Sequence, residues 1–442
     1  MEPKTEAETS QSQDSKITRD IKDQVNISDD KAPQSIILLI SDKIGDVNKL
    51  ITNSILLLTF FIMMVIFYRE WKNTPIIIEP YEVSKDVEKE NYTGKMISNG
   101  IIAEIGNIYK MANTSMEHRE IIGSWMGDRE QFKLPGSDIS ISSLISYLKT
   151  RYGITEIHIT GEAVKVSKGI QITTRLSGKQ PIRVIATSTS MSTLYKTAAE
   201  YIIKNTQPYI LAAYYYALDK KKCSELIDYI LLQGPDDNIP PAYNLRGILL
   251  TDEHKYDEAI HSYQKATELD PKLAMAYSNW GSALDELGDV NGAIVKYEKA
   301  IELDPKGEAA YYNWGIALDE QGDVNGAIVK YQKATKLDPK DAAAYYNWGV
   351  ALAKLGDVKG AIVKYEKAIE LDPKDAAAYY NWGVALGKLG DLKGAIVKYQ
   401  KAIELDPKLA LAYIGWGNVL KKQGDIKDAD VKFKKAKEVE SE

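Results

Sequence analysis

Tryptophan recurs at a fixed interval of 34 residues through the C-terminal half of this chain. The five positions are Trp280, Trp314, Trp348, Trp382 and Trp416, and the residues around them repeat almost unchanged. A fixed period of this length is typical of a solenoid, in which a helix pair buries its apolar face only by stacking on copies of itself. The period therefore predicts an all-α C-terminal half whose default role is to hold another protein.

Other residues keep the same period, and each has a physical reason. Glycine inside the first helix and alanine inside the second let two helix axes approach closely. A Gly-Asp pair between the helices supplies a left-handed turn and an acceptor for the free amides of the second helix. Leu-Asp-Pro ends the second helix. The glycines inside the first helices are Gly247, Gly281, Gly315, Gly349, Gly383 and Gly417.

These residues together resemble the tetratricopeptide repeat family, with about six units over residues 240–442. The first unit departs from the pattern, because Arg246 replaces the tryptophan and the Gly-Asp turn is absent around His254. Atypical end units are expected as solubilising caps. The resemblance implies an all-α solenoid, a right-handed superhelix of helix pairs, with the first helices lining a concave groove.

The first helices carry the residues that we expect in this groove. Tyrosines form a ladder with asparagines beside it, and the charge changes from acidic at Asp285 to basic at Lys422. The predicted partner-binding residues are Tyr312, Asn313, Asp319, Tyr346, Asn347, Lys354, Tyr380, Asn381, Lys388, Asn418 and Lys421. Asparagine amides would bond the backbone of a peptide, and the charge gradient would fix its direction. The alternative is that near-identical units carry a default, solvated surface.

The N-terminal part of the chain predicts a membrane anchor. Residues 50–68 carry no charge and are followed by Arg69, Trp71 and Lys72, which suits a single transmembrane helix that ends at the lipid headgroups. A buried core helix is the alternative. The periodicity of residues 35–49 predicts an amphipathic juxtamembrane helix, and the polar composition of residues 1–34 predicts a disordered tail.

Residues 73–205 predict a small α+β domain between the anchor and the repeats. A strand over 74–83, a helix over 94–112, a polar connection over 116–136 and a helix over 141–153 precede three strands near 154–167, 169–178 and 181–188. A helix over 191–205 closes the domain. This order predicts a mixed sheet covered by helices. We interpret residues 206–239 as a degenerate helical pair that links the domain to the repeats.

Composition and motifs argue against several function classes. The net charge of −6 gives no basic excess, so nucleic acid is not an expected partner. The sequence contains no Gly-rich phosphate loop and no metal-ligand cluster, so we expect no cofactor and no metal. Cys223 beside three lysines and His158 near Glu156 and Glu162 are the nearest candidates for chemistry. We favour a linker cysteine without a role for Cys223, and an outward strand face gives the same pattern around His158.

The sequence therefore predicts a non-enzymatic, membrane-anchored scaffold that binds a protein or peptide in the groove of its repeats. The alternative is an envelope sensor whose α+β domain binds a small molecule while the repeats relay the signal or oligomerise. Near-identical repeats also allow a homo-oligomer. We expect a bacterial inner membrane, but three basic residues before the span and four after it leave the side of the C-terminal domain open.

Overall fold

The computed structural model describes residues 76–112, 121–123, 157–186 and 191–441, together with Ser54, Phe61 and Met64. The chain divides into two compact units, one of residues 1–79 and 119–159 and the other of residues 80–118 and 160–442. The predicted tail, juxtamembrane helix and second helix of the α+β domain lie outside the described residues. Within the described part of the chain, no helix is long and apolar enough to cross a membrane. The predicted span at 50–68 lies almost entirely outside that part.

The described residues of the first unit form three short parallel strand segments. Strand β1 (Ile76–Ile78) pairs with β3 (Ile121–Gly123) and with the first residues of β4 (Ile157–Val166). Ile76 and Ile78 are fully buried, as expected for a strand with apolar residues at alternate positions. Strand β3 corrects the prediction of a plain polar connection over 116–136. Its Ile-Ile pair is too short to give a periodic signal, and pairing with β1 makes it a strand.

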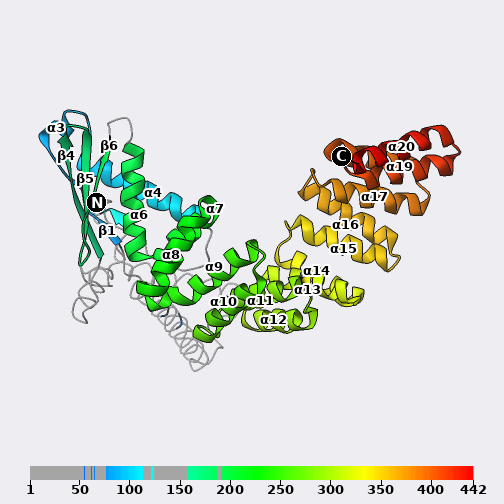
Figure 1. Cartoon of the computed structure of the whole chain (residues 1–442), viewed down its shortest axis with the longest axis horizontal. Helices are drawn as coiled ribbons and strands as arrows, with labels where there is room; N and C mark the ends of the chain where they lie inside the picture. Colours follow the sequence, from blue (N-terminus) through cyan, green and yellow to red (C-terminus); the bar gives the residue numbers. More distant parts are fainter. Residues whose placement is uncertain are drawn as a thin grey trace, which may run out of the picture. The chain divides into compact units, whose positions relative to one another are not determined.

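The second unit begins with the rest of the sheet and the helices that cover it. Strands β2 (Glu82–Val83) and β4 are parallel, and β5 (Gly169–Leu176) and β6 (Ile182–Ala186) are antiparallel, so the sheet is mixed as predicted. Helix α3 (Lys85–Glu88) is a single turn. Helix α4 (Gly94–Ala112) forms over the predicted residues and buries Ile97, Ile101, Ile105 and Ile108. Helix α6 (Met191–Thr206) packs against α4, β5 and β6 (Figure 1).

Two short helices connect this region to the repeats. Helix α7 (Pro208–Leu218) contacts α4 and α6, and α8 (Lys220–Gln233) follows after a break at Asp219. The Asp219 carboxylate accepts a hydrogen bond from the backbone N–H of Lys222 at 3.1 Å, which explains why the helix restarts there. A single 3₁₀ turn, η2 (Asp236–Asn238), leads into the first repeat.

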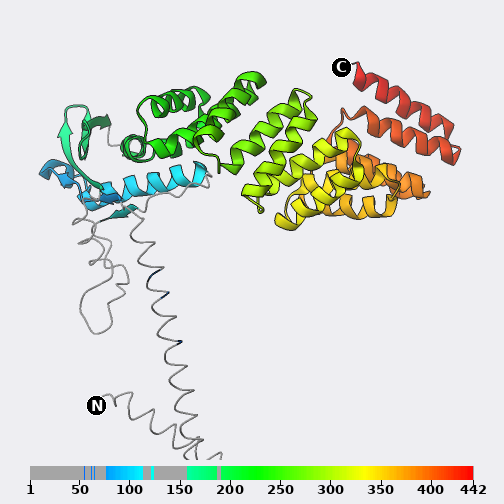
Figure 2. The same cartoon turned by 90° about the horizontal axis from the view of Figure 1, so that it is seen from below.

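The remainder of the chain consists of helix pairs that stack in chain order (Figures 1 and 2). The first helices are α9 (Ile239–Asp252), α11 (Ala274–Glu286), α13 (Glu308–Gln321), α15 (Ala342–Lys354), α17 (Ala376–Leu389) and α19 (Ala410–Gln423). The second helices are α10 (Tyr256–Leu269), α12 (Val290–Leu303), α14 (Val324–Leu337), α16 (Val358–Leu371), α18 (Leu392–Leu405) and α20 (Ile426–Glu440).

The repeated glycines allow close helix packing and left-handed turns, as the sequence predicts. A Cβ atom at Gly315 would lie 2.6 Å from the Tyr331 ring, so the close approach of the two helices requires glycine. The turn glycines adopt a φ between 81° and 89°. The aspartate after Gly322 caps α14, because Asp323 accepts the backbone N–H of Gly326 at 2.9 Å. In the atypical first unit His254 takes the left-handed position, with a φ of 58°.

Candidate functional site

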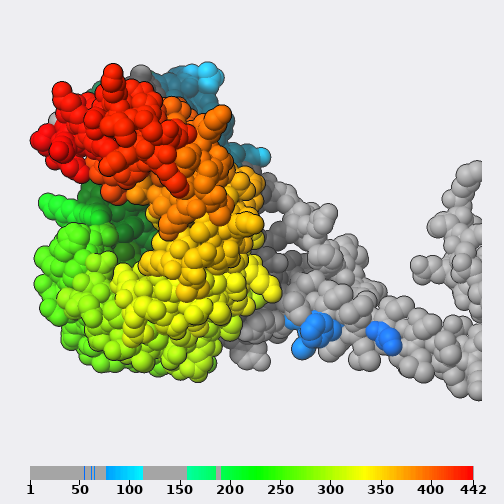
Figure 3. All heavy atoms as spheres, turned by 90° about the vertical axis from the view of Figure 1, so that its right-hand side faces the viewer, coloured from blue at the N-terminus to red at the C-terminus, as the bar shows by residue number. Residues whose placement is uncertain are grey.

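The first helices of the repeats form one continuous face. Each contacts the first helix of the next unit, from α9 with α11 to α17 with α19, and Figure 3 shows the units succeeding one another from lime to red. Contact between consecutive first helices places their side chains next to each other along the array. All eleven predicted groove residues lie in these first helices.

The tyrosines and asparagines of this face are joined in pairs across the unit boundaries. The amide of Asn347 donates to the Tyr312 hydroxyl at 3.0 Å, and the amide of Asn381 donates to the Tyr346 hydroxyl at 2.9 Å. The amide of Asn313 donates to Ser282 at 3.1 Å instead, because no groove tyrosine precedes it. These bonds tie neighbouring units together, a role that the sequence pattern does not reveal. Within the described structure, the amide oxygens of Asn347 and Asn381 keep the capacity to accept a bond from a ligand.

The groove tyrosines also pack on the buried tyrosines of the second helices. The ring centroids of Tyr346 and Tyr365 lie 6.2 Å apart, and Tyr312 and Tyr380 make the same contact with their own second helices at 6.2 and 6.0 Å. Partial burial raises the pKa of all three groove tyrosines. They are neutral at physiological pH and act as rigid, half-buried walls with hydroxyl tips.

The charge gradient along the face contains one internal ion pair. The Lys354 ammonium lies 2.7 Å from the Asp319 carboxylate, where the acidic units meet the basic ones. Toward the acidic end, burial together with the charges of Glu320 and Glu286 raises the pKa of Asp285 to about 6. Toward the basic end Lys388, Asn418 and Lys421 are exposed. The structure thus places an acidic stretch and a basic stretch on the same face.

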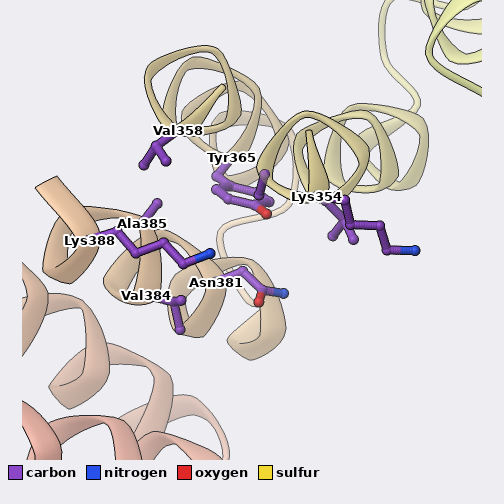
Figure 4. Close-up of a pocket in the computed structure, with 9 residues that line it drawn as sticks. Lys354, Val358, Tyr365, Asn381, Val384, Ala385 and Lys388 are labelled. Carbon is purple, nitrogen blue, oxygen red and sulfur yellow. The ribbon is translucent and has the colours of Figure 1, made fainter. Parts of the chain in front are cut away.

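A pocket opens on this face between the fourth and fifth units. It has a volume of about 190 Å³. Its lining residues are Val350, Ala353, Lys354, Val358, Tyr365, Asn381, Val384, Ala385 and Lys388. The side chain of Lys388 runs toward Tyr365 and Asn381, whereas that of Lys354 points away from the pocket (Figure 4). Three of the predicted groove residues, Lys354, Asn381 and Lys388, therefore contribute atoms to the lining of one cavity.

The repeated tryptophans pack against the buried clusters between neighbouring units, and each has a partner that was not predicted from the sequence. A lysine of the second helix lies over each indole ring, with Lys330 over Trp314 at 3.0 Å and Lys398 over Trp382 at 3.2 Å from ammonium to centroid. The desolvation of Lys330 and Lys398 lowers their pKa. This cation–π contact recurs in every unit that has the tryptophan. The sequence pattern that could have predicted this contact is a lysine 16 residues after each repeated tryptophan.

The surroundings of Cys223 and His158, the two candidates for chemistry outside the repeats, do not favour a catalytic role. Cys223 is buried, and burial raises the pKa of its thiol to about 12, the opposite of an activated nucleophile. His158 lies 3.0 Å from Glu79, and Glu162 pairs with Arg175 at 2.6 Å. His158 and Glu162 thus have separate carboxylate and guanidinium partners. Among the residues described, no group of histidine, cysteine and carboxylate side chains is arranged to hold a metal ion.

Comparison with protein families matches only the repeats. A model described as "TPR repeat" matches residues 281–322, 317–356, 351–390 and 388–424, and one described as "Tetratricopeptide repeat" matches residues 240–273. No curated protein sequence matches the chain.

Several solved structures resemble part of this chain. A MamA structure is 32% identical, covering 36% of this chain and 94% of its own, with a TM-score of 0.35. MamA from Desulfovibrio magneticus RS-1 is 29% identical, covering 38% and 95%, with a TM-score of 0.37. YrrB, described as a tetratricopeptide-repeat protein with an unusual peptide-binding site, is 26% identical, covering 41% and 93%, with a TM-score of 0.37.

Proposed function

The repeat half of this chain belongs to the tetratricopeptide-repeat family, and from this premise we propose that the protein is a membrane-anchored scaffold. Its first-helix face binds an extended segment of a protein partner. The observation that carries the proposal is the continuity of this face across the units, with half-buried tyrosines, asparagine amide oxygens and separated acidic and basic stretches. Such a face offers apolar contact, backbone recognition and polarity to one extended chain.

The anchor is the part of the proposal that rests on the sequence. Residues 50–68 provide the uncharged length that a bilayer requires. Phe61 and Met64, two of its described residues, are helical and expose 62% and 57% of their surface, as apolar residues facing lipid would. We place the protein in a bacterial inner membrane, with the side of the repeats left open. The sensor alternative and self-association of the repeats stay predictions.

Crosslinking in the native membrane tests this function. Full-length chain carrying Lys388→Glu and Lys421→Glu is compared with wild type and with a control carrying Lys393→Glu and Lys427→Glu. The control lysines are exposed on second helices, so the net charge changes equally outside the groove. We expect crosslinked partners of wild type and control to coincide and at least one to disappear from the groove variant. Identical partner sets for all three proteins would refute binding by the groove.

A further inference from the structure

The near-identical units provide an internal comparison for the pocket between α15 and α17. Lys354 and Lys388 occupy the same position in consecutive units. Lys354 has a carboxylate partner in the preceding unit, Asp319, at 2.7 Å. The position equivalent to Asp319 one unit later is Ala353, so Lys388 has no such carboxylate. Among the described residues, no acidic side chain pairs with Lys388.

The pocket lies where alanine, at Ala353, replaces the aspartate of the preceding unit. Ala353 forms part of the wall where the preceding unit has its aspartate, and Val350 and Val384 make the wall apolar. Lys388 points into the cavity (Figure 4). A cation beside an apolar cavity without its own anion is complementary to a ligand that brings both a carboxylate and aliphatic surface.

We propose that this pocket binds the side-chain carboxylate of an aspartate or glutamate that stands next to an aliphatic residue in the partner. The ligand carboxylate takes the place at Lys388 that Asp319 takes at Lys354. The aliphatic neighbour packs between Val350 and Val384, and the amide oxygen of Asn381 accepts a backbone N–H of the segment. This inference rests on the proposed function and specifies which kind of segment the groove selects.

The surroundings favour an internal carboxylate over a chain end. First helices continue the face on both sides of the two that line the pocket, because α13 contacts α15 and α19 contacts α17. A segment that passes through is contacted on both sides of its carboxylate, whereas a chain terminus leaves one side of the face unused. Lys421 and Lys422 further favour additional acidic residues on the side of the last unit.

Fluorescence anisotropy with full-length protein in detergent tests the proposal with defined peptides. The probe is a short peptide with a leucine followed by two glutamates and with both ends blocked. A second peptide has glutamine at both glutamate positions, and a third has glutamines and a free C-terminal carboxylate. We expect the first peptide to bind at least about tenfold more tightly than the other two, and salt to weaken this binding.

Two protein variants locate the binding at Lys388. Ala353→Asp restores the aspartate of the preceding units and gives Lys388 an internal partner, and Lys388→Glu introduces the residue found at Glu286 and Glu320. Each introduces a residue that other units carry at the same position, so we expect both variants to retain the fold, which circular dichroism verifies. Each should weaken binding of the glutamate peptide about tenfold, while Lys393→Glu should leave it unchanged.

Several results would overturn the inference. These are equal binding of glutamate and glutamine peptides, no effect of Ala353→Asp, or equally tight binding of the peptide with the free terminus. Absence of binding by every peptide up to about 1 mM would also refute the carboxylate pocket. Because the crosslinking experiment uses the natural partner, it can still support the groove when the peptides fail, so the two proposals fail separately.

Discussion

Glu308 breaks the regularity of the repeats at a single residue. The equivalent positions in the neighbouring units hold alanine, at Ala274, Ala342, Ala376 and Ala410. Partial burial and a hydrogen bond with Asp341 raise the pKa of the Glu308 carboxyl to about 7, and the charge of Asp338 adds to this. Asp341 already accepts the backbone N–H groups of Ala343 and Ala344 at the start of α15. A protonated Glu308 can donate a hydrogen bond to Asp341, whereas two ionised carboxylates would repel each other.

The Glu308→Gln variant should therefore change stability in a pH-dependent way. A carboxyl with a raised folded-state pKa binds its proton more tightly in the folded protein, so folding is favoured at low pH. That stability is lost as the pH rises from about 4.5 through about 7. Glutamine keeps a donor toward Asp341 at every pH. We expect the variant to be more stable than wild type by about 1 kcal/mol at pH 8, after discounting for solvent screening.

The same comparison at pH 4.5 provides the control, because wild-type Glu308 is then protonated. The two proteins should melt at the same temperature when followed by circular dichroism. The raised pKa of Asp285 contributes to both proteins and cancels in the difference. A gain in stability that is the same at both pH values would mean that the Glu308 proton is not its cause.

At the scale of the helix, α17 contains two glycines with opposite roles. A Cβ atom at Gly383 would lie 2.7 Å from the Tyr399 ring, whereas one at Gly387 would lie 3.8 Å from Val419, an ordinary contact. Gly383→Ala should destabilise the protein by about 1–3 kcal/mol through overpacking. Gly387→Ala should stabilise it by up to about 1 kcal/mol through helix propensity. Thermal unfolding of the two variants side by side measures both effects, and equal shifts would contradict this assignment.

The start of each second helix offers a prediction with its own control. The Asp357 carboxylate accepts the backbone N–H of Gly360 at 2.9 Å and caps α16. Asp357→Ala should cost about 1 kcal/mol of stability, and Asp357→Asn should cost only a small part of that, because asparagine caps a helix nearly as well. Urea unfolding of the two variants measures the difference. Equal losses would show that charge, and not the hydrogen bond, matters at this position.

Elements with a strong local signal were predictable from the sequence, and those made by tertiary contact were not. The stripe of isoleucines in α4 and the Gly-Asp turns fix local geometry by themselves. Strand β3 depends on its pairing with β1, and the bond from Asn347 to Tyr312 depends on how two units stack. The pocket at Lys388 could not be predicted from the sequence, because it forms where Ala353 of one unit lies beside Lys388 of the next.

For the molecule as a whole, periodicity makes each unit a reference for the next. A substitution that breaks the pattern while the backbone stays regular identifies a position under a different constraint. Ala353 and Glu308 are such positions, and both lie in first helices. The second helices vary less in the residues that pack, since Tyr331, Tyr365 and Tyr399 are all buried against a first-helix glycine. Function is therefore expected on the first-helix face.

The largest-scale prediction concerns the membrane, and it follows from residues 50–68. Full-length protein should remain in the membrane pellet after washes with high salt and alkaline carbonate, which remove peripheral proteins. Leu58→Arg with Ile62→Arg places two charges near the centre of the predicted span, each at a cost of about 2.5–3.5 kcal/mol. We expect this variant in the supernatant, and Leu58→Ile with Ile62→Leu in the pellet, because it preserves the apolar length. Recovery of wild type in the carbonate supernatant would show that these residues do not anchor the chain, and the scaffold would then have to reach its partner without a tether.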